Sequence, residues 1–417
     1  MSYSKRYILL IVIFLQVIAA DIFAQKLGCK DPYAKNFLSS NKQDDCECEY
    51  RFTRANPVFI VDIPNSINES SALIFLNQKY WTINDSGGEN ILFALDPITG
   101  EIGQQIKVQN AVNTDWEALT MDEEFLYVGD FGNNLGNRKD LTIYKVRLED
   151  IPAEGNGNVV AEKITFAYPT QKNFESGFRH NFDCEAFIVK DNSIFLFTKN
   201  WENHQTDLYQ LPTDAGNYEA NFIDSFDVNG LITAAAISND QDKIVLLGYQ
   251  NYVPFIWLIF DFHDIIFFEG NKRRIDFPNM ATMQTEGICF VESDKIAISS
   301  EKTPTFSGRL MRLNTSPWLE HPGMNGSLKT FKKTDFEVIE DQLNPTIATV
   351  SVHSKRNGNF RLDVTESTGK VLYSTLICIT RNAKKDFQMK LLELRPGTYV
   401  ISLLNKKRII SKTTSIQ

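Results

Sequence analysis

Acidic residues stand at matching places in the middle of the chain, just before or just after short apolar runs. One set precedes the runs and consists of Glu69, Glu117, Glu185 and Glu286. A second set follows the next apolar run and consists of Asp85, Asp130 and Glu301. Carboxylates that are brought close together repel one another, which raises their pKa values or favours a bound cation. Oxygen ligands suit calcium better than zinc, so these residues are predicted to bind Ca²⁺.

Polar residues beside these carboxylates are candidates for holding a second ligand. They are Asp115, Asp183, Asn133, Asn134, Lys199 and Lys302. The two lysines would contact an anionic ligand, although single lysines are commonly solvated. Glycines in the same loops let the backbone approach a ligand closely; they are Gly87, Gly88, Gly129 and Gly132. Nearby tryptophans would stack on a sugar or base or pack in the core; they are Trp81, Trp116, Trp201 and Trp257.

These residues belong to a repeat of strand-like segments. Each copy has an apolar strand, a polar turn, a second strand, a polar loop and a third strand; the copies begin at Asn68, Asp115, Asp183, Thr233 and Thr285. Fourth strands such as "GQQIKVQ" and "KRRIDFP" lie between the copies. A repeat of about 50 residues with four strands is typical of a β-propeller blade. The fold class is therefore predicted as all-β, with a propeller over residues 53–318. Five blades are visible, and the long stretch 149–182 leaves six as an alternative.

The propeller would bring the glutamates together, because the first strand of each blade lines the central channel. Four of the blades would contribute a glutamate, and Thr233 takes that place in the remaining one. Residues 57–64 precede the first copy and are expected to pair with the last blade, which would close the ring. The glutamates have two other interpretations: they hydrogen-bond neighbouring backbone without any ligand, or they act as general acids and bases.

Familiar catalytic signatures are missing from the sequence. The run from Asp85 to Gly88, "DSGG", is like the nucleophile loop of a trypsin-type protease, but that site needs a histidine earlier in the chain and the first histidine is His180. The sequence contains no Gly-x-Ser-x-Gly, no His-Glu-x-x-His and no phosphate-binding Gly-x-x-x-x-Gly-Lys loop. His180 is expected either to form a loop hydrogen bond or to act as an acid or base.

The two ends of the chain differ from its middle. Residues 1–24 have the layout of a cleavable secretory signal, with Lys5 and Arg6 before an apolar run. No later stretch reaches the roughly 18 apolar residues of a membrane-spanning helix, so no transmembrane anchor is expected after signal cleavage. Residues 319–343 read as a linker, and residues 344–417 alternate apolar and polar side chains as in a small β-sandwich.

Charge is distributed unevenly between these parts. Residues 335–417 hold 13 Lys and Arg against 8 Asp and Glu, and residues 1–334 hold 30 against 44. The acidic part argues against a nucleic-acid partner and suits cation binding.

Three stretches resemble known families. "GCKDPYAKNFLSSNKQDDCECEY", residues 28–50, resembles a short cysteine module of exported Bacteroidetes proteins, assigned here to residues 25–52. The resemblance implies a disulfide between Cys29 and Cys48, with Cys46 as an extra thiol. "NP" at 344–345, "STGKVLY" from Ser367 and "LLELRPGTYVISLLNKKRIISK" from Leu391 resemble the type A sorting domain of type IX secretion. This second resemblance implies the type IX machinery as a partner and export through the periplasm and outer membrane; the alternative is a carbohydrate-binding or adhesion sandwich.

The central region resembles the propeller found beside such sorting domains, through "NDSG", "DWEAL", "GDFGNN", "NRKDLTIYKV", "DCEAF" and "TEGI". More distantly it is similar to phytase-like and SdiA-regulated propellers. Those families imply six blades, calcium at the channel mouth and, in the phytase-like branch, hydrolysis of phosphoesters.

The leading hypothesis is an exported or cell-surface propeller that binds a divalent cation and an unknown small-molecule, saccharide or protein ligand. One alternative is a calcium-dependent hydrolase of phosphoesters or lactones, in which the cation activates water. Another is a non-catalytic adhesin or scaffold.

Overall fold

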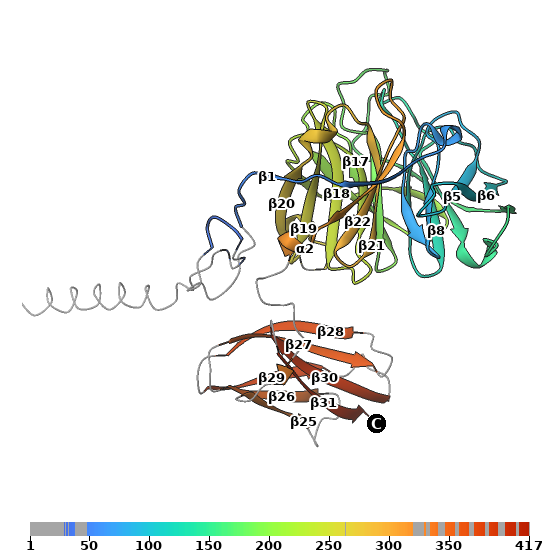
Figure 1. The fold of residues 1–417 in the computed structure, drawn as a ribbon. Helices are drawn as coiled ribbons and strands as arrows, with labels where there is room; N and C mark the ends of the chain where they lie inside the picture. Colours follow the sequence, from blue (N-terminus) through green and yellow to red (C-terminus); the bar gives the residue numbers. More distant parts are fainter. Residues whose placement is uncertain are drawn as a thin grey trace, which may run out of the picture. The chain divides into compact units, whose positions relative to one another are not determined.

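A computed structural model of the chain describes residues 29, 31, 33–37, 48–262 and 264–319, together with strands between 329 and 416 (Figure 1). The chain divides into two compact units, one of which is Leu27–Leu319 and the other of which contains Glu320–Gln417. The predicted signal peptide, Cys46 and the sorting motifs at 344–345, 367–370 and 391–396 lie outside the described residues. In the part of the chain that is described, no helix has the length and apolarity needed to cross a membrane.

The described part of Leu27–Leu319 forms five β-sheets, each of which is one blade of a propeller. Blade 1 contains β3 (Ile74–Leu76), β4 (Lys79–Thr82), β5 (Ile91–Leu95), β6 (Ile102–Val108) and β10 (Gly157–Val159). Blade 2 contains β7 (Trp116–Met121), β8 (Phe125–Asp130), β9 (Thr142–Arg147), β11 (Glu162–Ala167) and β15 (Gly216–Glu219). Blade 3 contains β12 (Cys184–Lys190), β13 (Ser193–Thr198), β14 (Thr206–Pro212) and β16 (Asn221–Phe226).

The last two blades include strands from the start of the propeller. Blade 4 contains β17 (Leu231–Ile237), β18 (Lys243–Gln250), β19 (Val253–Phe260), β20 (Asn271–Asp276) and β1 (Thr53–Arg54). Blade 5 contains β21 (Thr285–Glu292), β22 (Lys295–Ser300), β23 (Arg309–Asn314) and β2 (Val58–Asp62). Short helical turns connect some of these strands: η1 (Asn65–Ile67), η2 (Leu148–Asp150), η3 (Phe267–Glu269), η4 (Pro278–Met280) and α2 (Ser316–Leu319).

The five blades form a closed ring. The inner strands β3, β7, β12, β17 and β21 contact one another in that order, and β21 contacts β3. As predicted, the strand before the first repeat closes the ring, because β2 pairs antiparallel with β23 from Val58 opposite Arg312. The six-blade alternative is wrong. The stretch 149–182 supplies β10 to the edge of blade 1 and β11 to blade 2, and does not form a blade of its own.

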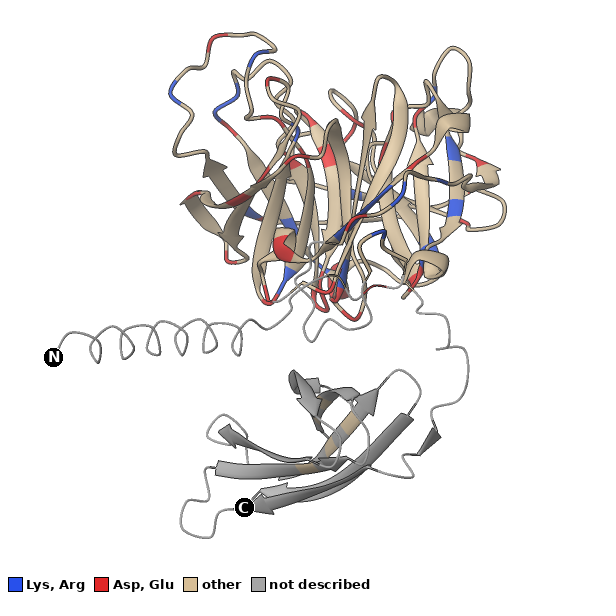
Figure 2. Cartoon of the chain, turned by 90° about the vertical axis from the view of Figure 1, so that its left-hand side faces the viewer, with Lys and Arg blue, Asp and Glu red and all other residues tan. Residues whose placement is uncertain are grey.

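The hydrophobic core lies between neighbouring blades. Each blade is covered on both faces, so its strands are apolar on both sides. In β13, Ile194 and Leu196 pack toward blade 2, whereas Phe195 and Phe197 pack toward blade 4. Charged residues of the propeller lie mainly in loops and at strand ends, as Figure 2 shows. The packing therefore fixes the blades rigidly and leaves the strand ends to build a site.

The N-terminal segment contains a disulfide and joins the propeller through a parallel strand. Cys29 and Cys48 form the disulfide that the resemblance to the cysteine module implies. The adjoining strand β1 pairs in parallel with β20 of blade 4. Cys184 and Cys289 are free and buried, as expected for small apolar residues.

The C-terminal unit consists of two sheets and forms the predicted small β-sandwich. One sheet contains β24 (Lys329–Thr330), β31 (Arg408–Ile416), β30 (Gly397–Asn405), β27 (Gly358–Glu366) and β28 (Val371–Ile379). The other contains β25 (Thr334–Glu340), β26 (Ile347–Ser354) and β29 (Ala383–Lys390). Alternate residues are buried between them, such as Leu362 and Val364 in β27. The stretch predicted as a linker, 319–343, already contains β24 and β25, so it is not a linker throughout.

Candidate metal centre

A β-bulge near the start of the inner strands determines where the glutamates lie. In β7 the pairing with β8 shifts between Trp116 and Ala118, which makes Glu117 the extra residue. The same shift occurs at Glu185 in β12 and at Glu286 in β21. Thr233 has this position in β17. A bulge re-aims the side chain of its extra residue, and the predicted equivalence of these residues is confirmed.

Blade 1 departs from the predicted alignment. Ser70 pairs with Asn84 in an isolated bridge, as Trp116 pairs with Asp130 in blade 2. The residue equivalent to Glu117 is therefore Ser71, whose buried hydroxyl donates to the Trp116 carbonyl at 2.8 Å. Glu69 is exposed and corresponds to Asp115. Its predicted equivalence to Glu117, Glu185 and Glu286 is wrong, although its charge still acts on Asp85 and Glu301.

The second predicted set also shifts by one residue in blade 2. Asp130 pairs with the first residue of β7, so the residue that matches Asp85, Lys199 and Glu301 is Phe131. Phe131 is fully buried in the core. Asp130 is buried too, and its Oδ1 accepts hydrogen bonds from Arg138 at 2.9 Å and from the Asp115 N–H at 3.0 Å. The Asp130 carboxylate that was predicted as a metal ligand thus holds its own loop in place.

Two of the predicted ligand-binding residues tie blade 2 to blade 3. The Asp183 carboxylate accepts hydrogen bonds from the backbone N–H groups of Asn133 (2.7 Å) and Cys184 (3.0 Å). Its other oxygen accepts from the Trp201 indole at 2.8 Å. The Asn133 side chain accepts from the Arg138 N–H at 2.9 Å. Both side chains are occupied by protein partners, which supports a structural role.

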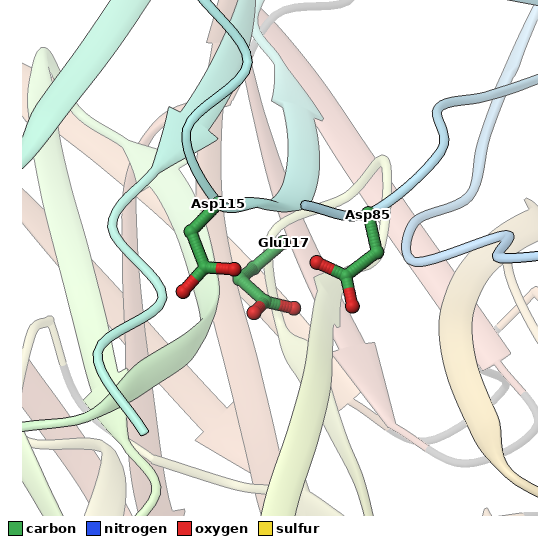
Figure 3. A group of neighbouring side chains, drawn as sticks. All are labelled: Asp85, Asp115 and Glu117. Atoms are coloured by element: carbon green, nitrogen blue, oxygen red, sulfur yellow. The ribbon is translucent and has the colours of Figure 1, made fainter. Parts of the chain in front are cut away.

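Asp85, Asp115 and Glu117 form a compact cluster of carboxylates (Figure 3). Each offers an oxygen, and these oxygens all lie within 4.8 Å of one another. Among the described residues, none donates a hydrogen bond to the Glu117 carboxylate, although that side chain is buried. A Cβ atom on Gly132 would lie 2.3 Å from Glu117 Oε1 and 2.4 Å from Asp115 Oδ2. A side chain at this position would therefore require the two carboxylates to move.

The cluster is under electrostatic stress. Burial, together with the nearby Asp85, Asp183 and Asp130 charges, raises the pKa of Asp115 to about 7 from 3.8. Burial, with Glu185 and Asp85, raises the pKa of Glu117 well above its usual value. Burial also raises the pKa of Asp85. These shifts have the sign expected for carboxylates that lack a neutralising cation.

A cavity of about 570 Å³ opens beside the cluster and is lined by residues from every blade. Its carboxylates belong to Asp85, Glu117, Glu185, Glu286 and Glu301. Among the described residues that line it, only Lys199 is basic, and its ammonium forms an ion pair with Glu185 Oε1. Burial and the charges of neighbouring carboxylates raise the pKa values of Glu286 and Glu301 to about 8. Burial lowers the pKa of Lys199, but Glu185 and Glu286 raise it more, so the lysine stays charged.

The remaining predicted residues divide between the cavity and the surface. Asn134 lines the cavity, and its carbonyl accepts a hydrogen bond from His180 Nε2 at 3.0 Å, so His180 makes the loop hydrogen bond. Lys302 is exposed and donates to the Asn65 side chain at 3.0 Å. Ser86 is exposed in its loop. Trp201 lines the cavity, whereas Trp81 and Trp116 are core residues.

Several cavity residues were not predicted from the sequence. Tyr249 lies near the end of β18, Tyr252 lies in the turn after that strand, and Gln284 precedes β21. Tyr249 stands at the position of Asp85, Lys199 and Glu301, so the repeat itself contained the signal that locates it. Nothing in the repeat distinguishes Tyr252 or Gln284 from ordinary loop residues.

No protein-family model and no curated protein matches this chain. Solved structures that are similar include PorZ, a surface component of the type IX secretion system of Porphyromonas gingivalis, at 11% identity and a TM-score of 0.32 over 93% of this chain and 49% of PorZ. This chain thus spans about half the length of PorZ. An exo-β-1,3-galactanase from Phanerochaete chrysosporium is 8% identical, with a TM-score of 0.36 over 91% of this chain and 93% of the enzyme. A putative 6-phosphogluconolactonase from Bacteroides uniformis is 9% identical, with a TM-score of 0.30 over 78% and 89%. Likenesses at this level carry no argument about activity.

Proposed function

We propose that this protein is an exported β-propeller that binds a divalent cation, calcium, through Asp85, Asp115 and Glu117 at the mouth of its channel, and a second ligand in the cavity beside it. The observation that carries the proposal is the approach of the three carboxylates to within 4.8 Å of one another. Oxygens that share one calcium ion each lie about 2.3–2.6 Å from it, so they are at most about 5 Å apart.

Calcium suits this cluster for two further reasons. It takes six to eight oxygen ligands in a flexible arrangement, and three carboxylates leave positions for water or for a second ligand from the cavity. The burial that raises the pKa values of Asp115 and Glu117 also makes their neutralisation by a cation favourable.

Export is supported by two features of the chain. The Cys29–Cys48 disulfide is of the kind that persists outside the reducing cytoplasm. The signal-like residues 1–24 and the C-terminal resemblance add the type IX secretion machinery as a partner, which would place the propeller in the medium or at the cell surface.

The charge of the cavity favours binding over phosphoester hydrolysis. Its carboxylates outnumber Lys199, which is already paired with Glu185. A phosphoester would be repelled unless several cations were bound at once. The cavity therefore suits the binding of a cation and a ligand better than the hydrolysis of a phosphoester.

Calcium titrated into the full chain is expected to bind and to raise its melting temperature. At about 100 times the dissociation constant, a bound ion stabilises the folded state by about 2.7 kcal/mol, which is roughly 5–10 °C for a domain of this size. The Glu117→Gln variant is expected to lose this stabilisation. The matched control is Glu123→Gln, which changes an exposed glutamate in the turn between β7 and β8, at the far end of the strand that carries Glu117, and is expected to keep it. Identical wild-type melting curves with calcium and with chelator would reject the proposal.

Gly132→Ala is expected to abolish calcium binding, because its Cβ atom would overlap the carboxylates of Asp115 and Glu117. Gly177→Ala is the control, since a Cβ atom there meets nothing within 4 Å. The measurement is calorimetric titration of calcium into both variants. Equal affinities for the two would show that the ion binds elsewhere.

A further inference from the structure

Part of the cavity lies beyond the calcium cluster and holds three carboxyl groups, of which one oxygen is paired with a cation. Glu286 and Glu301 come from blade 5, and Glu185 comes from blade 3. Among the described residues, none donates a hydrogen bond to the carboxyl group of Glu286 or Glu301. Lys199 neutralises one oxygen of Glu185, but Glu185 Oε2 is buried without a partner, in a side chain that is only 4% exposed. Buried carboxylate oxygens are normally hydrogen-bonded, so this wall of the cavity lacks a donor.

Aromatic side chains surround the entrance to the same cavity. Trp201 and Tyr252 line it, and the Trp201 indole is held in place by Asp183 at 2.8 Å. Phe178 is 60% exposed and packs edge-on against Trp201 with ring centroids 5.9 Å apart. Tyr252 is 73% exposed. Exposed aromatic groups gathered at one opening mark a binding surface.

The backbone at this entrance is strained. Asn251 and Tyr252 form the tight turn between β18 and β19, with φ values of 49° and 63°. This left-handed region favours glycine, and a bulky aromatic residue adopts it rarely. Thr282 also lines the cavity, has a φ of 71° and donates its N–H to the Tyr252 carbonyl at 2.7 Å. The turn therefore holds Tyr252 at the cavity in a backbone conformation that an aromatic residue rarely adopts.

We propose that the cavity binds an organic cation, a guanidinium or primary ammonium group on a short apolar chain, with the charged group between Glu286 and Glu301 and the chain against Trp201 and Tyr252. A cationic donor group supplies the hydrogen bonds and positive charge that the carboxylates lack. A bound cation stabilises the ionised carboxylates, whereas an anion or a neutral sugar supplies no positive charge. This inference deepens the proposed function by naming the class of the second ligand, and it does not require calcium to occupy its cluster.

The test uses calorimetric titration of the full chain with three probes, each with calcium and with chelator. N-acetylarginine amide carries a guanidinium group, N-acetylcitrulline amide has nearly the same shape without the charge, and butylamine carries only a primary ammonium group. We expect both charged probes to bind and the citrulline probe to bind at least tenfold more weakly. Tighter binding of butylamine would indicate a primary amine as the natural ligand, and tighter binding of the arginine probe would indicate a guanidinium group.

Variants locate the bound probe. Glu286→Gln and Glu301→Gln are each expected to weaken the charged probes about tenfold or more. Tyr252→Gly removes the aromatic ring while relieving the strained turn, so it is expected to fold well and to weaken binding several-fold. Its control is Asn192→Gly, which relieves a φ of 58° in the turn between β12 and β13, away from the cavity. Equal binding of the charged and neutral probes, no binding of any charged probe, or binding that survives both glutamine variants would overturn the inference. Probe binding in chelator together with no calcium binding would reject only the proposed calcium site.

Discussion

Replacing Arg138 with methionine is expected to lower the free energy of unfolding by about 3–5 kcal/mol, because it leaves the buried Asp130 carboxylate without its cation. The Asp130 side chain is 2% exposed and Arg138 is 12% exposed. Arg138 also donates to the Gly132 carbonyl at 2.9 Å, and this contact fixes the glycine beside the carboxylate cluster. The measurement is denaturant unfolding of the full chain.

The control for this prediction is Arg147→Met. Arg147 lies 3.6 Å from Glu149, and both side chains are largely in solvent, at 42% and 77% exposure. An exposed pair of this kind contributes about 0–1 kcal/mol. If the Arg138 and Arg147 variants lost similar stability, Asp130 would not depend on Arg138, and its interpretation as a structural residue would be wrong.

Calcium affinity is expected to rise steeply with pH between about 6 and 8. The pKa of Asp115 is about 7 in the folded protein, and burial raises that of Glu117 as well. Protons therefore occupy the carboxylates at pH 6 and compete with the ion, as they do for any ligand that must be deprotonated. Each displaced proton is expected to change the affinity up to about tenfold per pH unit. Calorimetric titration of calcium at pH 6, 7 and 8 measures the affinity. An affinity that does not change with pH would contradict the prediction.

In the calcium-free protein, buried carboxyl groups are expected to make the folded state less stable as pH rises, whereas calcium affinity increases. Asp115, Glu286 and Glu301 have folded pKa values of about 7, 8 and 8, whereas their usual values are 3.8, 4.5 and 4.5. At pH values between the usual pKa and the folded pKa of each group, the folded state binds more protons than the unfolded state. The free energy of unfolding therefore decreases as pH rises. The melting temperature without calcium is expected to fall from pH 5 to pH 8, and calcium is expected to oppose that fall at pH 8.

The repeat in the sequence was sufficient to predict the propeller. Apolar runs such as "SIFLFT" in β13 are buried on both faces between blades, and their spacing marks each copy. The closing strand was predictable because residues 57–64 had no blade of their own. The number of blades could not be predicted from the sequence. The stretch 149–182 supplies both β10 and β11, but these two strands join different sheets.

The site was predictable only in part, because a sequence does not show register. Glu117, Glu185 and Glu286 were aligned correctly since each follows one residue after the strand begins. Glu69 was misplaced because the bridge between Ser70 and Asn84 makes Ser71 the equivalent residue. Asp130 was misjudged because its partner Arg138 lies in a loop with no repeated pattern. Asp115 lies in the cluster with Asp85 and Glu117, but the sequence predicted it only as a residue that binds a second ligand.

The most direct measurement of the central claim is a crystal structure of the full chain grown with calcium, with the ion located by its anomalous scattering. We expect a peak about 2.3–2.6 Å from carboxylate oxygens of Asp85, Asp115 and Glu117. We expect no ion on Asp130, whose carboxylate is paired with Arg138. An empty cluster at saturating calcium, or an ion bound at Glu69 instead, would contradict the account.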